Sequence, residues 1–259
     1  MKLRADEPET TTINTIERPD RDMLAEAVEA AGSHAWVGRA LSAPLRKLWL
    51  DVTHVGRENV PSEGPVVLAA NHLAFIDSLL VMYSLGRPVS FLGKAEYLEH
   101  PIARRLFPMT GMVPLDRTGK RARVTLRRVQ QILAAGGIVG VHPEGTRSRD
   151  GVLNPGHSGV AQMALRASAP VVPVALVGTD TVQPVGSRVP AFRGKVEIRY
   201  GAPIGMGEWA SNRRTRRART ELTEEVMQSI AALSGQRRRE ELGAECSSPH
   251  PAANESMHH

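Results

Sequence analysis

The sequence predicts an α/β fold, with a mostly parallel central sheet flanked by helices and an N-terminal amphipathic helical segment before it. Two observations support the sheet. Short runs rich in valine and isoleucine alternate with longer helical patterns between residues 66 and 200, and strands separated by helices favour parallel pairing. Most of these runs are apolar throughout, which is expected of strands covered on both faces. The length of 259 residues is sufficient for one large domain with a substantial core.

The individual elements follow from these patterns and from the residues that end helices. The expected strands span 66–70, 89–92, 112–115, 138–142, 171–177 and 195–200. The expected helices span 77–85, 95–106, 119–135, 157–168 and 212–233. Residues 51–234 would therefore form the main domain. Residues 1–19 lack the apolar core of a signal peptide and are expected to be disordered, as are residues 235–259, which show no sustained apolar period.

Residues 20–50 are expected to form a helical, amphipathic segment. Residues 20–31 predict one helix, and after it large apolar side chains recur at helical spacing beside arginines and a lysine. Trp36 and Trp49 lie on the apolar side, and tryptophan favours places where one end is dry and the other wet. Two interpretations remain open, namely a helix packed on its own domain and a helix lying in a lipid interface.

Charge and composition limit the possible partners. Basic residues outnumber acidic ones by 33 to 27, and the net charge of +6 favours a polyanion such as nucleic acid or anionic lipid. Aromatic residues make up only 4% of the chain, which leaves little for stacking on bases, and no nucleic-acid-binding motif accompanies the arginines at 212–219 and 237–239. No apolar run reaches about 18 residues, so membrane contact would be peripheral. The single cysteine, Cys246, excludes an internal disulfide.

The stretch "AANHLAFIDSLL" at 69–80 holds the first candidate site residues, His72 and Asp77. His72 follows an expected strand and Asp77 opens the next helix, so the pair straddles a turn at the carboxyl end of the sheet, where open α/β sheets bind ligands. An aspartate that accepts the proton of one imidazole nitrogen fixes the tautomer and leaves the other nitrogen as a general base. The alternative is a pair that only ties the turn together.

The stretch "VHPEGTRSRDG" at 141–151 supplies a candidate anion site. Glu144, Gly145, Thr146 and Arg147 lie in the loop that follows an expected strand. Glycine lets backbone amides approach a ligand closely, and arginine can bind a phosphate or carboxylate through two parallel hydrogen bonds. A polar turn with an internal ion pair between Glu144 and Arg147 is the alternative.

Two further strand ends carry candidate cations. In "GMVPLDRTGKRARVTLRR" at 111–128, a short strand runs into Arg117 and then into a helix with basic first turns, and a helix N-terminus beside an arginine is a ready phosphate site. Lys94 follows the expected strand at 89–92, where an exposed lysine without a function is the alternative.

Together these stretches resemble the acyltransferases of the 1-acylglycerol-3-phosphate and glycerol-3-phosphate type. Four blocks of that family occur in order, as "NHLAFID" at 71–77, "GMVPLDR" at 111–117, "HPEGTRS" at 142–148 and "VVPVAL" at 171–176, within a likeness that covers roughly residues 50–205. The resemblance implies an acyltransferase domain at 51–234, with His72 as general base and Asp77 as its orienting partner. It also implies acceptor-phosphate and active-site roles for Gly111, Arg117, Glu144, Gly145 and Arg147.

The chain departs from the family pattern at a few positions. His142 replaces the usual aromatic residue before Pro143, and Pro114 and Leu115 replace phenylalanine and isoleucine of the second block. Every residue type that the chemistry needs is retained. The departures leave the identity of the acceptor and the preferred acyl chain open.

The resemblance implies a reaction of phospholipid biosynthesis. A fatty acyl group would pass from acyl-CoA, or from an acyl carrier protein, to the hydroxyl of 1-acylglycerol 3-phosphate and give phosphatidic acid. Glycerol 3-phosphate or another lysolipid is the alternative acceptor. We expect no cofactor, no metal and a peripheral location on the cytoplasmic face of the cell membrane. A basic protein that binds anionic lipid or nucleic acid without catalysis is the alternative of another class.

Overall fold

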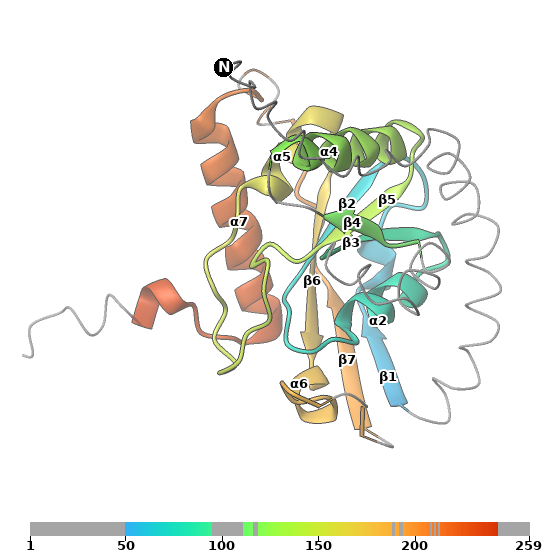
Figure 1. The fold of residues 1–259 in the computed structure, drawn as a ribbon, viewed down its shortest axis with the longest axis vertical. Helices are drawn as coiled ribbons and strands as arrows, with labels where there is room; N and C mark the ends of the chain where they lie inside the picture. The colour runs from blue at the N-terminus through green and yellow to red at the C-terminus, as the bar shows by residue number, and fades with distance from the viewer. Residues whose placement is uncertain are drawn as a thin grey trace, which may run out of the picture.

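The computed structural model describes residues 50–94, 111–115, 119–187, 190–191, 194–207, 209, 211 and 213–242. Seven strands form one sheet: β1 (Leu50–Val55), β2 (Val66–Ala70), β3 (Val89–Lys94), β4 (Val113–Leu115), β5 (Ile138–Val141), β6 (Val171–Val177) and β7 (Gly194–Tyr200). The helices are α2 (Asp77–Ser84), α4 (Gly119–Ala134), α5 (Gly159–Ala167), α6 (Thr179–Val182) and α7 (Arg216–Ser234), with a 3₁₀ turn at Arg57–Asn59. Figure 1 shows the arrangement.

The sheet has the order β1-β7-β6-β2-β5-β3-β4, and every neighbouring pair is parallel except β6 with β7. The α/β fold with a mostly parallel sheet is thereby confirmed. The central strand β2 pairs with β5 and β6, so that Leu68 lies opposite Gly140 on one side and Val172 on the other. Because β2 and β5 are parallel, the residues that follow them emerge at the same edge of the sheet.

Two apolar cores cover the two faces of this sheet. In β2, Val67 and Ala69 pack toward α4, α5 and α7, whereas Val66, Leu68 and Ala70 pack toward α2 and α6. This alternation is the period of an extended strand, and burial on both faces explains the continuous apolar run in the sequence. Figure 1 shows α7 and α2 on opposite sides of the sheet.

All six expected strands occur, but β1 and α6 were not anticipated. The β1 residues are mostly exposed and pair only with β7, so this edge strand lacks the apolar run that marks the others. Its first residue, Leu50, had been assigned to the amphipathic segment. The expected disordered stretch 1–19, the rest of 20–50 and the expected helix 95–106 lie outside the described residues. None of the described helices combines the length and apolar character needed to cross a membrane.

Residues 235–242 pack on the domain, which corrects the boundary expected at residue 234. Gly235 ends α7 with a φ of 74°, in the left-handed region. The next residues run beside Leu153, whose N–H donates to the Arg237 carbonyl at 2.9 Å and whose carbonyl accepts from the Arg239 N–H at 3.0 Å. Backbone hydrogen bonds and arginine contacts therefore hold residues 235–242 on the domain, although their sequence shows no apolar period. The remainder of the expected tail, 243–259, lies outside the described residues.

Candidate active site

His72 and Asp77 meet in the turn between β2 and α2. The His72 Nδ1 lies 3.0 Å from Asp77 Oδ2. The same oxygen accepts the backbone N–H groups of Leu73 at 2.6 Å and Ala74 at 2.8 Å, so the turn closes around the carboxylate. When Nδ1–H donates to Asp77, Nε2 is the ring nitrogen that can accept a proton. The expected His–Asp pair is therefore present and has the geometry of an oriented general base.

The two members of the pair differ in exposure. Asp77 is fully buried, and its Oδ1 has no hydrogen-bond partner among the described residues. Burial raises the pKa of the Asp77 carboxyl above its usual range, against the backbone hydrogen bonds from Ala74 and Leu73, which lower it. The His72 side chain is 17% exposed, which gives a substrate access to the ring. A buried carboxylate behind a partly exposed imidazole suits proton transfer at Nε2.

Two side chains hold this turn against neighbouring elements. The Asn71 side chain donates to the Leu176 carbonyl at 3.0 Å and accepts the Leu176 N–H at 2.7 Å, which fixes the start of the turn to β6. It also donates to Gln236 Oε1 at 2.7 Å, in the segment that follows α7. Gln183 Oε1 accepts the Ile76 N–H at 3.0 Å. The turn is thus fixed on both sides of His72.

The loop after β5 binds the main chain of His72. The His72 N–H donates to Glu144 Oε1 at 3.0 Å, and the His72 carbonyl accepts the Ser148 N–H at 2.7 Å. Glu144 Oε2 accepts both the N–H and the side-chain amide of Asn154, at 2.9 and 3.0 Å. Burial raises the pKa of Glu144, while these hydrogen bonds lower it. Glu144 therefore joins two loops to the turn that carries His72, and does not form the internal ion pair considered for Arg147.

The middle of this loop presents groups that can bind an anion. Gly145 has a φ of 65°, in the left-handed region, and its N–H donates to the His142 carbonyl at 3.0 Å, which closes a tight turn. Thr146 is exposed and Arg147 is partly exposed. Among the residues that the structure describes, neither Thr146 nor Arg147 has a hydrogen-bond or ion-pair partner. Because the Ser148 N–H donates to the His72 carbonyl, the backbone of Arg147 adjoins a residue that contacts His72.

His142 is the functional candidate that sequence reasoning missed. Its ring stacks on His72, with centroids 3.8 Å apart and planes at 3°. Its Nδ1 lies 3.0 Å from the Ala70 carbonyl and its Nε2 lies 3.0 Å from Ser78 Oγ. Burial, and then the neighbouring His72, lower the pKa of His142 to about 3, so this ring is neutral at physiological pH. The sequence feature that could have pointed to His142 is a histidine at a position where the family usually has an aromatic residue.

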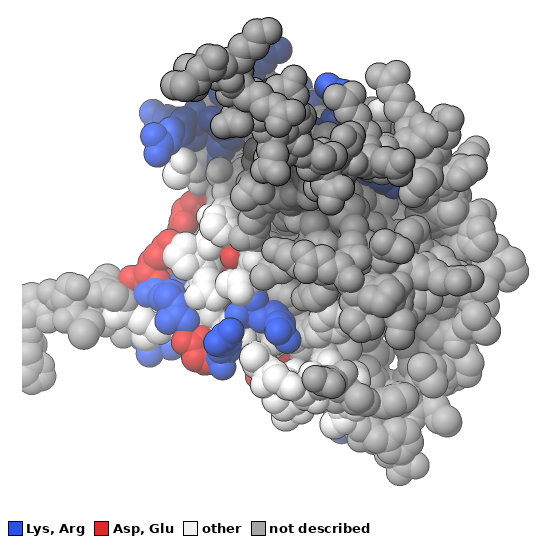
Figure 2. Space-filling model, viewed as in Figure 1, with Lys and Arg blue, Asp and Glu red and all other residues white. Residues whose placement is uncertain are grey.

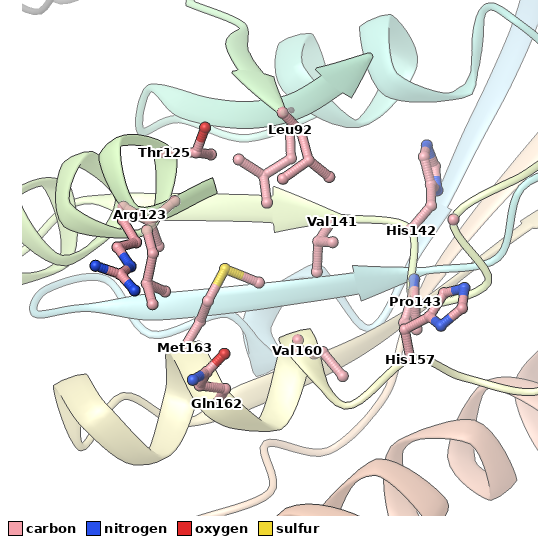
Figure 3. A pocket seen from close by; sticks show the side chains of 15 residues that line it. Leu92, Arg123, Thr125, Val141, His142, Pro143, His157, Val160, Gln162 and Met163 are labelled. Carbon is pink, nitrogen blue, oxygen red and sulfur yellow. The ribbon is translucent and has the colours of Figure 1, made fainter. Parts of the chain in front are cut away.

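A cavity of about 410 Å³ opens beside the pair. Its lining is mainly apolar and includes Leu92, Leu115, Leu126, Val129, Val141, Val160 and Met163. These residues come from β3, β4, β5, α4 and α5. His142, Pro143 and Gly145 line the end nearest the catalytic turn, and Figure 3 shows Arg123 at the opposite side from His142. The apolar cavity therefore ends at His142, whose ring stacks on that of the candidate base His72.

The remaining predicted site residues are not all described. Gly111 lies two residues before the start of the edge strand β4 and has a φ of 77°. Lys94 ends β3, and its side chain lies outside the described part of the chain, as does Arg117. The structure thus brings together His72, Asp77 and the loop at 144–147. The roles of Gly111, Lys94 and Arg117 stay predictions.

Curated relatives match between about half and three fifths of this chain. A 1-acyl-sn-glycerol-3-phosphate acyltransferase of Brassica napus chloroplasts is 34% identical over 170 residues, which cover 62% of this chain and 49% of the relative. The Arabidopsis thaliana chloroplast enzyme of that name is 34% identical and covers 62% and 48%. That of Borreliella burgdorferi is 28% identical and covers 51% and 55%. The chain spans about half the length of these relatives.

A solved structure and a family model complete the comparison. The crystal structure of the 1-acyl-sn-glycerophosphate acyltransferase PlsC from Thermotoga maritima superposes with a TM-score of 0.58 at 24% identity, over 88% of this chain and 84% of that one, which shows the shared fold. The family model described as acyltransferase matches residues 51–177, a range that contains the His72–Asp77 pair and the loop at 144–147. Residues 51–177 of this chain therefore match the acyltransferase family.

Proposed function

We propose that this protein transfers a fatty acyl group from an acyl thioester to the free hydroxyl of 1-acylglycerol 3-phosphate and so makes phosphatidic acid. The observation that carries the proposal is the His72–Asp77 pair, joined at 3.0 Å beside a loop whose Arg147 has no hydrogen-bond or ion-pair partner among the described residues. The names of the relatives support this acceptor. The thioester would be acyl-CoA or an acyl carrier protein.

In the proposed reaction, His72 Nε2 takes the proton of the acceptor hydroxyl while its oxygen attacks the thioester carbonyl. Asp77 stabilises the imidazolium that forms. The tetrahedral intermediate then collapses with cleavage of the carbon–sulfur bond, and the imidazolium returns its proton to the departing thiolate. General base catalysis of this kind contributes about 10²- to 10⁴-fold. No covalent acyl-enzyme and no cofactor or metal takes part in this scheme.

Positioning would supply much of the remaining acceleration. Arg147 would hold the acceptor phosphate, with Arg117, Lys94 and Gly111 as further proposed contributors. The backbone N–H groups of Thr146 and Arg147 have no partner among the described residues and can donate to the oxyanion of the intermediate. The acyl chain would occupy the apolar cavity of about 410 Å³, which ends at His142 beside the base.

We propose that the enzyme works as a peripheral protein on the cytoplasmic face of the cell membrane, held in part by residues 20–50. Exposed arginines support an anionic surface as partner: Figure 2 shows basic side chains at the start of α7, where Arg213, Arg214, Arg216 and Arg217 are exposed. Removing residues 1–49 should then weaken binding to liposomes that contain anionic lipid. Undiminished sedimentation with those liposomes would contradict this attachment.

The function is tested by acyl transfer with a panel of acceptors. Purified protein receives labelled acyl-CoA and 1-acylglycerol 3-phosphate, glycerol 3-phosphate or another lysolipid, and products are resolved by mass. We expect phosphatidic acid, and a loss of about 10²- to 10⁴-fold in kcat for His72→Ala with little change in folding. His54→Ala is the matched control, because His54 is an exposed histidine on β1. Absence of transfer to every acceptor, or full activity of His72→Ala, would overturn the proposal.

A further inference from the structure

The His142 side chain is attached to both elements that carry the catalytic pair. Its Nδ1–H donates to the carbonyl of Ala70, the last residue of β2 and two residues before His72. Its Nε2 accepts from the hydroxyl of Ser78, the residue that follows Asp77 on α2. One imidazole therefore links the strand that leads to the base with the helix that carries the orienting carboxylate.

The plane of the His142 ring is fixed as well as its position. Two hydrogen bonds at 3.0 Å from opposite sides of the imidazole prevent the ring from rotating about its Cβ–Cγ bond. The Phe91 ring lies against it, with centroids 4.7 Å apart and planes at 46°. His142 is only 9% exposed. The flat ring that faces His72 is therefore held rigidly.

The His72 ring lies on this surface, with centroids 3.8 Å apart and planes at 3°. We propose that His142 is a positioning residue for the catalytic base, whose ring is fixed by Ala70 and Ser78 and in turn sets the plane of the His72 imidazole against Asp77. The proposal rests on the proposed function. A phenylalanine at this position would keep an aromatic face, but it would leave the Ala70 carbonyl and the Ser78 hydroxyl without this partner.

The chemistry of the stack requires a neutral ring at position 142. Two imidazolium ions at stacking distance would repel one another, and His72 becomes charged when it takes the substrate proton. Burial holds the pKa of His142 at about 3, so only His72 carries charge during the reaction. The hydrogen bond to Ala70 also selects the Nδ1–H form of His142, and Ser78 then has to be the donor at Nε2. The two contacts are consistent with each other and with a neutral ring.

The test separates positioning from stability through two serines of the same helix. Ser78→Ala removes one attachment of the His142 ring, whereas Ser84→Ala removes a buried serine hydroxyl that binds Tyr200, at the far end of α2. His142→Phe removes both attachments and keeps an aromatic ring. We expect kcat to fall about 3- to 10-fold in Ser78→Ala and His142→Phe, with an unchanged KM for the acceptor. Ser84→Ala should keep the wild-type kcat even where its melting temperature falls.

Nitrogen-15 NMR of the histidine rings makes the test independent of turnover. In the wild type and in Ser84→Ala, the His72 ring nitrogens should report one species, protonated at Nδ1. In Ser78→Ala and His142→Phe they should report a mixture of the two neutral forms. Identical His72 signals in all four proteins would overturn the positioning role. If the wild type transfers no acyl group, the proposed function fails, and the NMR comparison alone supports or overturns the role of His142.

Discussion

The replacement Asp77→Asn tests which atom of the side chain faces His72. The backbone N–H groups of Leu73 and Ala74 both donate to Asp77 Oδ2, at 2.6 and 2.8 Å. In asparagine the amide oxygen should occupy this place, because the NH₂ group would face two donors. That oxygen also accepts the Nδ1–H of His72, which lies 3.0 Å from Oδ2 in the wild type. The tautomer of His72 should therefore be retained, and only the negative charge lost.

The size of the effect follows from that charge. A hydrogen bond to a charged group is worth about 1.5 to 3 kcal/mol, and the imidazolium formed in the transition state would lose this contribution. We expect kcat/KM to fall about 10- to 150-fold. A reversed tautomer would instead place a proton on Nε2 and remove the base, as in the serine protease triad, where the same change costs about 10⁴-fold in kcat.

Initial rates of phosphatidic acid formation from labelled acyl-CoA, at saturating and at low acceptor, give kcat and kcat/KM for wild type and Asp77→Asn. Asp77→Ala is the reference for losing the oxygen altogether, and it should be less active than Asp77→Asn. A loss of about 10⁴-fold in Asp77→Asn, with nitrogen-15 shifts showing His72 protonated at Nε2, would refute the reasoning from the two backbone amides.

Three further predictions concern the phosphate, the core and acid stability. Arg147→Ala should raise the KM of the acceptor about 10- to 100-fold and change kcat less, because a charge-assisted contact to the phosphate is lost; initial rates at varied acceptor measure this. A Cβ on Gly140 would overlap the Phe91 ring, so Gly140→Ala should lower the free energy of unfolding in urea by about 1 to 3 kcal/mol. The pKa of His142 is about 3 in the folded chain, whereas an unperturbed histidine has a pKa of 6.5. As the pH falls below 6.5, the unfolded chain therefore gains a proton at His142 and the folded chain does not. The free energy of unfolding should fall by about 2 kcal/mol from this group between about pH 7.5 and about pH 5, and His142→Phe should lack this contribution.

Each of these predictions has a contrary outcome. Arg149→Ala is the control for Arg147→Ala, since Arg149 is exposed in the same loop; an equal rise in KM for both would indicate a diffuse charge effect. Unchanged urea midpoints for Gly140→Ala would show that Phe91 moves freely. The same pH dependence of unfolding in His142→Phe and wild type would mean that the folded protein protonates His142 in the ordinary range.

The contact between His72 and Asp77 could be predicted from the sequence because its geometry is local. His72 and Asp77 are five residues apart, on either side of a turn whose place at the end of β2 follows from the apolar strand before it. The loop at 144–147 follows β5 in the same way, and parallel pairing brings both loops to one edge. The contacts of Glu144 were harder to predict from the sequence, because its partners are backbone groups and Asn154.

Features that depend on distant partners escaped prediction. His142 binds Ala70 and Ser78, which are 72 and 64 residues away, and no local pattern links these three residues. The edge strand β1 was missed because most of its side chains are exposed and its pairing with β7 spans the length of the domain. The spacing of apolar residues indicates which side chains are buried, and it gives no signal where backbone hydrogen bonds alone hold a segment in place.

The segment after α7 contacts residues that support the turn carrying His72. Gln236 binds the Asn71 side chain, and Arg239 Nε donates to Asn154 Oδ1 at 2.9 Å, behind the Glu144 that receives the His72 N–H. A protein shortened after residue 235 would keep every residue proposed to contact substrate, yet it would lose one hydrogen-bonded support on each side of the His72 imidazole. Truncating or tagging this region should therefore disturb the position of the His72 side chain, although the change is far from His72 in the sequence.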